Sequence, residues 1–310
     1  MKFSLPYLLL LPLAIILVLL PTVLSSYSIS LITQALIFVL FAMSLDLLVG
    51  SLGLPSLGHA AFFGVGAYTA ALISLKVTMN FWICLIAGIF SGLIASAIFG
   101  LLAIRAGGSS FLMITLALGQ VLWGVAYKWR SFTGGDDGLT GIAFPSFGVP
   151  WALNRDSYYY IVLIIVSLMC VFLAIIVSSP FGLTLKGIRD SELRMKALGY
   201  NVVLYKYSCF ILAAAFASVS GVLFVFYNRF VGPSDLGIVL SAKGLLMVIL
   251  GGVGTLWGPA FGAMVITLME NIFSAVMDRW IMLLGIIYVL VILFFPRGVI
   301  GTIKEKARGN

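Results

Sequence analysis

Ionisable side chains are scarce in this chain. Charged residues make up 9% of its 310 residues, whereas hydrophobic residues make up 62% and the mean hydropathy is +1.20. Soluble domains usually carry about 25% charged residues, so a soluble globular fold is excluded. The apolar residues instead gather in runs of roughly 20, the length that crosses about 30 Å of hydrocarbon as a helix. The sequence therefore predicts an all-α polytopic membrane protein.

Residues that carry enzyme chemistry are equally scarce. The chain has one histidine, His59, and three cysteines, Cys84, Cys170 and Cys209, which fall inside apolar runs without metal-type spacing. The sequence contains no G-x-x-x-x-G-K-[ST], H-E-x-x-H or G-x-S-x-G motif. These absences argue against a membrane enzyme and predict no catalytic residue, no metal and no cofactor. If this membrane protein works with energy from ATP, another chain must hydrolyse the ATP.

Basic residues outnumber acidic ones, 18 to 10, which gives a net charge of +8. They lie between the apolar runs and near the C-terminus, as topology signals do, and do not indicate nucleic-acid binding. We expect one transmembrane domain over residues 1–310 with about ten spans, some of them broken or re-entrant where glycine is frequent. The expected spans cover approximately 7–25, 29–49, 57–76, 80–104, 108–129, 158–179, 205–228, 238–253, 258–276 and 280–296.

The lysines and arginines also predict the orientation. If the N-terminus is cytoplasmic, eleven of the 18 lie on the cytoplasmic side, six lie outside and Lys243 lies within a span. The positive-inside rule then places both termini in the cytoplasm. The first apolar run resembles a signal peptide, but no A-x-A site follows it, so an uncleaved first span is expected.

One segment departs from the general scarcity of charge. Residues 178–202, SSPFGLTLKGIRDSELRMKALGYNV, carry six ionisable side chains within eleven positions. Read as a helix over about 184–199, the segment combines an apolar stripe with opposite charges four residues apart. The stripe is Ile188, Ser191, Met195 and Leu198, and the pairs are Lys186–Asp190, Asp190–Arg194 and Glu192–Lys196. The pattern fits a solvated loop and a docking helix for a soluble partner about equally well.

Two glycine-rich stretches predict close packing. Residues 53–73 combine small residues with Pro55 and the single histidine, and the candidates there for a translocation pathway or for helix packing are Ser56, Gly58, His59, Gly64 and Gly66. For His59 alone, an inert hydrogen-bonded position is the favoured interpretation. Residues 251–265 contain Gly254, Gly258 and Gly262 at G-x-x-x-G spacing, which predicts a helix-packing face, and Pro259 suggests a helix start.

Three charged residues, Asp46, Lys243 and Glu270, lie within or at the ends of expected spans, and Asp46 is a further candidate for a translocation pathway or for helix packing. Charge inside a membrane is costly and points to function by default, although these residues can also pair with one another or lie near an interface. Outside the spans, residues 128–157 form the longest extracytoplasmic loop. Its GGDDG sequence is consistent both with a simple turn and with a contact surface.

Several motifs together resemble the LivM-type permeases of branched-chain amino acid ABC importers. They are SLGHAAFFGVGAYTAAL (56–72), FLMITLALGQVLWGVAYKWRSFTGGDDGLTGI (111–142), FGLTLKGIRDSELRMKALGYNV (181–202) and LMVILGGVGTLWGPAFGAMV (246–265). The resemblance runs in order from about residue 30 to 300. One departure is Asp46, where relatives more often carry asparagine. A carboxylate there is consistent with selection of a cationic or amide-bearing substrate, with pairing to a partner permease, or with a residue choice shared by a subgroup of the family.

The resemblance implies an ABC importer permease fold in a bacterial or archaeal plasma membrane. It implies a second, LivH-like permease subunit, two cytoplasmic ATPases below and an extracytoplasmic binding protein above. The helix at about 184–199 would then couple the ATPases to the membrane, through Leu185, Ile188, Arg189, Asp190, Glu192, Met195 and Leu198. The loop at about 130–157, with Arg130, Asp136 and Asp137, would contact the binding protein.

Two other classes of function remain as alternatives. A stand-alone secondary transporter or channel for a small polar solute would need a coupling-ion cluster inside the spans, and the sequence shows no such cluster. Within the same family, importers of urea, amides or aromatic acids are alternatives to importers of branched-chain amino acids. Branched-chain amino acids are the leading expectation.

Overall fold

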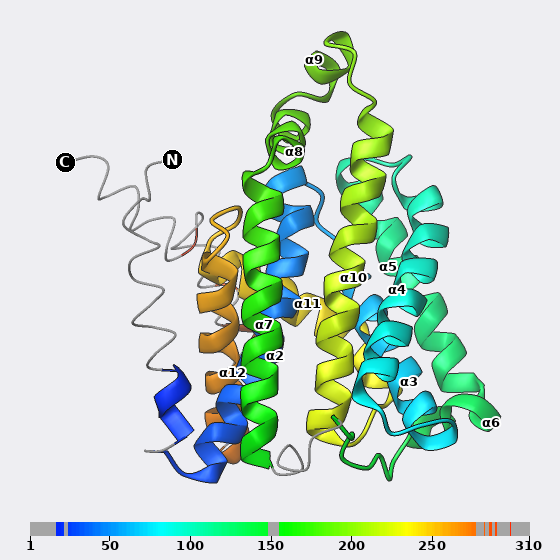
Figure 1. Cartoon of the computed structure of the whole chain (residues 1–310). Helices are drawn as coiled ribbons and strands as arrows, with labels where there is room; N and C mark the ends of the chain where they lie inside the picture. Colours follow the sequence, from blue (N-terminus) through cyan, green and yellow to red (C-terminus); the bar gives the residue numbers. More distant parts are fainter. Residues whose placement is uncertain are drawn as a thin grey trace.

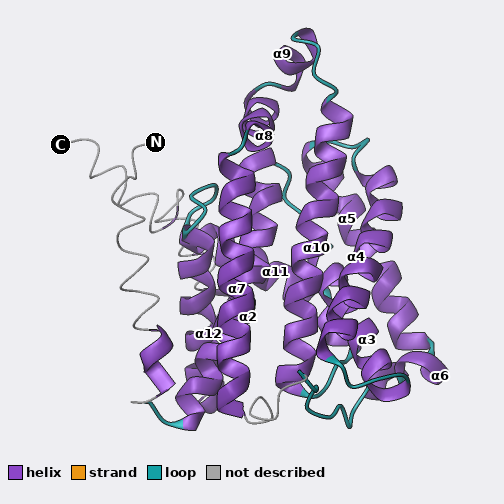
Figure 2. Ribbon diagram, in the orientation of Figure 1, coloured by secondary structure: helices purple, strands orange, loops and turns teal. Residues whose placement is uncertain are grey.

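The computed structural model describes residues 17–21, 24–147 and 155–276, together with positions 282, 285, 286, 289 and 298. In this described part the regular elements are all helices (Figure 2), and the only β-type pairings are two isolated bridges, Asn80–Ser146 and Leu139–Val231. The named elements are α2 (Ser26–Asp46), η1 (Leu47–Leu52), α3 (His59–Lys76), α4 (Phe81–Ala103), α5 (Gly108–Lys128), α6 (Arg130–Thr133), η2 (Gly135–Asp137), α7 (Arg155–Ser178), α8 (Pro180–Asp190), α9 (Glu192–Ala197), α10 (Val202–Asn228), η4 (Pro233–Leu236), α11 (Ile238–Gly251) and α12 (Gly258–Val276).

The all-helical membrane fold predicted from the sequence is confirmed. Among the described residues, five helical segments are long and apolar enough to cross a membrane: Ser26–Leu52, Phe81–Ala103, Gly108–Lys128, Ser157–Ser178 and Val202–Asn228. Helices occupy each position where a span was expected from 29–49 to 258–276. The expected first and tenth spans, 7–25 and 280–296, lie mostly outside the described residues. Ten spans and cytoplasmic termini therefore stay predictions.

Of these five segments, two lie at the centre of the bundle and three at its rim. The most apolar windows of Ser26–Leu52 and of α10 are 94% and 83% buried, whereas those of α4, α5 and α7 are only 22–33% buried. The rim helices expose apolar side chains at helical spacing, for example Ile86, Phe90 and Ile94 on α4. Such outward-facing apolar stripes suit contact with lipid. α10 crosses the middle of the bundle in Figure 1, with α4 and α5 on one side of it.

The centre is held together by small residues, as the glycine-rich sequence predicted. A Cβ added to Gly66 of α3 would lie only 2.5 Å from the Ser218 carbonyl oxygen on α10. Ser218 also donates a hydrogen bond from Oγ to the Phe62 carbonyl of α3 at 3.1 Å. A Cβ on Gly221, one turn further along α10, would collide with the Phe63 carbonyl. The backbones of α3 and α10 therefore approach closely, which is how helices associate where lipid removes the hydrophobic drive.

Several helices are interrupted inside the bundle. The last six residues of the first long segment form the π-helix η1, which ends at Gly53 in a left-handed conformation (φ +75°). η4 and the short helix α11 follow α10, and Leu236 of η4 packs against Gly64 in α3. Ala60 N–H at the start of α3 donates to Ser241 Oγ of α11 at 3.0 Å. Irregular backbone at this depth is tolerated where it is enclosed by protein or lines a cavity.

The two charged segments singled out in the sequence lie at opposite ends of the molecule. α8 and α9 project from one end of the bundle, and α6 lies at the other end (Figure 1). Lys76, at the end of α3, lies over the Phe132 ring of α6, so the end of α3 belongs to the α6 end as well. This arrangement agrees with the expectation that segments 178–202 and 128–157 face opposite sides of a membrane.

Candidate functional site

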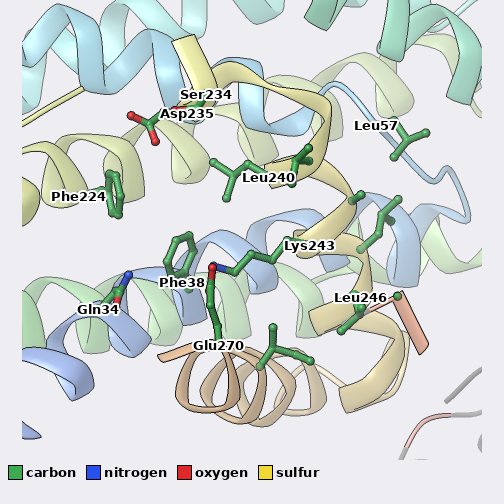
Figure 3. A pocket seen from close by; sticks show the side chains of 15 residues that line it. Gln34, Phe38, Leu57, Phe224, Ser234, Asp235, Leu240, Lys243, Leu246 and Glu270 are labelled. Atoms are coloured by element: carbon green, nitrogen blue, oxygen red, sulfur yellow. The ribbon is translucent and has the colours of Figure 1, made fainter. Parts of the chain in front are cut away.

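A cavity of about 620 Å³ lies among α2, α10, η4, α11 and α12 (Figure 3). Its volume is within the range of small-molecule sites, about 300–1,000 Å³. Most of its wall is apolar, with the Phe38 and Phe224 rings on one side. The lining residues are Gln34, Phe38, Leu57, Phe224, Ser234, Asp235, Val239, Leu240, Ala242, Lys243, Leu245, Leu246, Ile266, Glu270 and Gly285.

An ion pair stands in the wall of this cavity. Lys243 Nζ of α11 contacts the Glu270 carboxylate of α12, and their side chains are only 12% and 19% exposed. The same ammonium lies 4.2 Å from the centroid of the Phe38 ring, so it is also held by a cation–π contact (Figure 3). The expectation that intramembrane charges pair with one another is confirmed for these two residues.

Further polar groups of the wall come from elements that the sequence did not single out. Gln34 Oε1 on α2 accepts a hydrogen bond from Asn271 Nδ2 on α12 at 3.1 Å. Asp235 of η4 accepts a hydrogen bond from Gly232 N–H at 3.0 Å, which holds the turn that precedes α11. Sequence reasoning missed Gln34 and Asp235 because nothing local marks a polar residue as facing a cavity formed by five separate elements. The one signal available for Asp235 was its position as an acidic residue in a short loop between two apolar runs.

Asp46, in contrast, lies away from the cavity lining. It ends α2, is 5% exposed, and its Oδ1 accepts a hydrogen bond from Gly254 N–H in the α11–α12 loop at 2.8 Å. Close by, Arg189 Nη1 of α8 donates to the Gly50 carbonyl of η1 at 2.5 Å. We call Asp46, Gly50, Arg189 and Gly254 the junction. Since an asparagine Oδ1 accepts the same kind of hydrogen bond, a position occupied by either residue type agrees with this structural role.

The other candidates of residues 53–73 are packing residues in this structure. His59 is fully buried, with Nε2 at 2.8 Å from Ser44 Oγ and its ring close to those of Phe41 and Phe62. Ser56 Oγ accepts a hydrogen bond from Gly58 N–H at 3.3 Å. A Cβ on Gly58 would collide with the Thr115 backbone of α5. These contacts, with those of Gly64 and Gly66 above, agree with the packing interpretation, and Leu57 is the neighbour that reaches the cavity.

The packing face expected at Gly254, Gly258 and Gly262 agrees with the positions of two of these three glycines. A Cβ on Gly258 or Gly262 would collide with the Gly251 or Met247 carbonyl of α11, so both glycines bring α12 against α11. α12 begins at Gly258, next to Pro259 as expected. Gly254 instead lies in the preceding loop with φ +74°, where it serves the junction.

The expected single helix over about 184–199 is wrong, because the chain breaks at Ser191. α8 begins at Pro180 with Ser179 as its N-cap, and Ser191 then adopts an extended conformation (φ −163°, ψ 101°). Ser191 Oγ accepts a hydrogen bond from Arg194 N–H at 3.3 Å and so caps the new helix α9. The serine followed by an acidic first-turn residue was a readable start signal.

The break changes which residues of the segment face outward. Leu185, Ile188 and Met195 are buried at 0%, 3% and 9% exposure, so they pack inside the chain. The predicted stripe keeps only Leu198 as an exposed apolar residue, at 66%, and Leu193 joins it at 81%. We call five exposed apolar residues in α9 and the segment after it the tip: Leu193, Leu198, Tyr200, Val203 and Leu204.

The charges of α9 fix it to its neighbour. Of the expected pairs, Glu192–Lys196 is present at 2.9 Å, and Glu192 also accepts a hydrogen bond from Lys206 of α10 at 2.6 Å. Asp190, expected to pair along the helix, contacts the adjacent Arg189 at 3.3 Å. The hydrogen bonds from Lys206 and Lys196 hold the pKa of Glu192 below its usual value of 4.5.

At the opposite end, Arg130, Asp136 and Asp137 are exposed. Arg130 begins α6, and the two aspartates belong to the short 3₁₀-helix η2. The GGDDG sequence is therefore a tight turn with its carboxylates presented to the surroundings. Residues 148–154 of this loop lie outside the described part of the chain.

Comparison with known proteins places the chain in a family. Residues 27–295 match the family described as "Branched-chain amino acid transport system / permease component". The high-affinity branched-chain amino acid transport system permease proteins LivM of Salmonella typhimurium and of Escherichia coli are each 27% identical over 93% of this chain and 73% of their own length. The corresponding LivH protein of Salmonella typhimurium is 22% identical over 87% of this chain and 93% of its own length. No solved structure matches the chain. The chain thus belongs to the family of permease components of branched-chain amino acid transport systems.

Proposed function

We propose that this chain is the membrane-spanning permease subunit of an ATP-driven ABC importer, and that the cavity beside Lys243 and Glu270 is part of its translocation pathway. The observation that carries the proposal is the composition of this cavity. Its wall is apolar apart from a few polar groups, and these include both signs of charge. An amino acid with an apolar side chain has the same combination of properties, so branched-chain or related amino acids are the proposed substrates.

The partners follow from the family and from the two ends of the molecule. A LivH-like subunit would complete the pathway, since the relatives include both LivM and LivH proteins. Two ATPase subunits would dock on the tip, on the cytoplasmic side of a bacterial or archaeal plasma membrane. A substrate-binding protein would approach the other end, where Arg130, Asp136 and Asp137 are exposed. Both termini would be cytoplasmic and the chain would have about ten spans.

The junction supports a mechanism of alternating access. Closure of the ATPases would displace α8 and α9. Arg189 of α8 holds the Gly50 carbonyl of η1, and its guanidinium lies 3.5 Å from the place where a Cβ on Gly254 would be. Displacement of α8 would therefore shift η1 and the loop that ends α11, which carries Lys243. The π-helical geometry of η1 supports this role, because π-helical segments are frequent at functional sites.

Purification of the tagged chain from its native host, in mild detergent, tests this proposal. Mass spectrometry should identify a homologous permease and two ATPase subunits. Vesicles that contain this complex and the binding protein should accumulate branched-chain amino acids only with ATP. A lone homo-oligomer that transports solute without ATP would refute the importer and support the secondary-transporter alternative. Uptake of urea, amides or aromatic acids in place of branched-chain amino acids would keep the importer and change the substrate.

A further inference from the structure

The Lys243–Glu270 pair has two properties that simple helix pairing does not require. It connects α11 to α12, which are already in close backbone contact through Gly258 and Gly262. Both side chains also line the cavity (Figure 3). The charges are thus placed where a solute in the cavity can reach them.

We infer that Lys243 and Glu270 form a displaceable ion pair that recognises the two charged groups of a zwitterionic α-amino acid. The inference rests on the proposed function and names a binding site for it. The substrate carboxylate takes the place of Glu270 at the Lys243 ammonium, and the substrate ammonium takes the place of Lys243 at the Glu270 carboxylate. The apolar side chain of the substrate then lies against the side of the cavity formed by the Phe38 and Phe224 rings (Figure 3).

Electrostatics makes such a pair selective for solutes that carry both charges. In a site shielded from water, an unpaired charge is strongly destabilising, whereas a paired charge is tolerated. A simple anion or cation that entered the pair would satisfy one residue and leave the other unpaired. A zwitterion satisfies both residues at once and adds no net charge to the site. Selectivity for amino acids over organic acids and amines follows from this exchange of partners.

The surroundings of the pair help the exchange. The Phe38 ring lies 4.2 Å from Lys243 Nζ, so the ammonium keeps one favourable contact while its carboxylate partner changes. Gln34 and Asn271 are tied to each other at 3.1 Å, and the Asp235 carboxylate accepts the Gly232 N–H at 3.0 Å. The pair is therefore the part of the polar lining that offers a positive charge to the substrate carboxylate and a negative charge to the substrate ammonium.

The test replaces the pair in the complete transporter, reconstituted with its ATPases and binding protein. Lys243→Met/Glu270→Met removes both charges and retains side-chain volume. Lys243→Glu/Glu270→Lys keeps an ion pair and reverses its direction. The matched control is Thr69→Ala/Ser91→Ala, which removes a hydrogen-bonded pair between α3 and α4, 2.9 Å apart and remote from the cavity lining. The readouts are leucine uptake and ATP hydrolysis stimulated by the loaded binding protein.

We expect both Lys243/Glu270 double variants to hydrolyse ATP normally while their leucine uptake per ATP falls about tenfold or more, because a charge-assisted contact with the substrate is lost or misplaced. The control should retain wild-type uptake per ATP. A purely structural role would lower uptake and ATP hydrolysis in parallel, or leave the reversed pair fully active, and either result would overturn the inference. Failure of both variants to assemble would also overturn it, since a pair that opens in each cycle cannot be essential to the packed fold. Absence of ATP-driven uptake by the wild-type complex would instead refute the proposed function.

Discussion

The tip offers the sharpest test of the ATPase docking that we propose. Leu193 lies in the first turn of α9, in a segment that projects from the bundle (Figure 1), and it is 81% exposed. The side chain of a leucine in such a position contributes hydrophobic stabilisation only when a partner protein covers it. We therefore predict that Leu193→Ser weakens ATPase docking and leaves the fold of the isolated permease unchanged.

The size of the effect follows from the exposed area. Complete burial of a leucine side chain stabilises by about 1.5–3 kcal/mol. With 81% of the residue still exposed, docking can gain about 1–2.5 kcal/mol of this amount. The substitution should thus weaken ATPase binding by about fivefold to sixtyfold, since about 1.4 kcal/mol corresponds to a factor of ten.

The assay is titration of labelled ATPase subunits onto the permease complex in nanodiscs. Val77→Ser is the matched control, because Val77 is 76% exposed at the α6 end of the bundle. Ile188→Ser is a second comparison: Ile188 is 3% exposed, so its truncation should lower thermal stability, at a cost of about 2–5 kcal/mol. Unchanged ATPase affinity in Leu193→Ser, or an equal loss in Val77→Ser, would refute docking on the tip.

Two further predictions concern packing and pH. Gly66→Ala should destabilise the α3–α10 contact by about 1–3 kcal/mol, because the added Cβ would collide with the backbone of α10. Gly124→Ala is the control, since there is open space around Gly124 and the protein should keep its stability. Thermal unfolding of both variants in detergent tests the difference. The Glu192 carboxylate has a pKa below 4.5 in the folded chain, so its bond to Lys206 stabilises α9 fully above about pH 4.5 and is lost as the pH falls through the folded pKa. Hydrogen exchange of α9, corrected for the intrinsic rate, should increase on acidification in the wild type, and Glu192→Gln should show the faster exchange already at neutral pH.

Spans were predictable from the sequence because length and apolar composition decide them directly. The boundaries of α4 and α12 agree with expectation within one residue at each end. Glycine spacing likewise predicted a packing face at Gly258 and Gly262, although the structure was needed to identify α11 as the helix that they contact. Local chemistry was sufficient for both features.

The cavity could not be predicted in the same way. Two of its charged residues, Lys243 and Glu270, were recognised as unusual, but the partner of each was fixed by the packing of α11 on α12. The break at Ser191 had a local signal that the charge periodicity concealed, because pairs four residues apart suggested a continuous helix. Met195 illustrates the consequence: it belonged to the expected exposed stripe, and after the break its sulfur lies against Gly187 in α8.

α11 connects the two functional regions. One end of this 14-residue helix leads into Gly254, which donates to Asp46 in the junction, and the helix carries Lys243 about 12 Å before its end. A helix this short behaves as a rigid element, so a shift of the junction also shifts the Lys243 ammonium relative to Glu270. α12 is bound to α11 near Gly258 and Gly262, which limits such motion to a rotation or a small slide. Even a small rotation or slide changes the distance between the Lys243 ammonium and the Glu270 carboxylate, and the strength of an ion pair depends on that distance. A displacement of α8 through Arg189 would thus act on the pair that we assign to substrate recognition, and the lipid-facing helices α4 and α5 would not have to move.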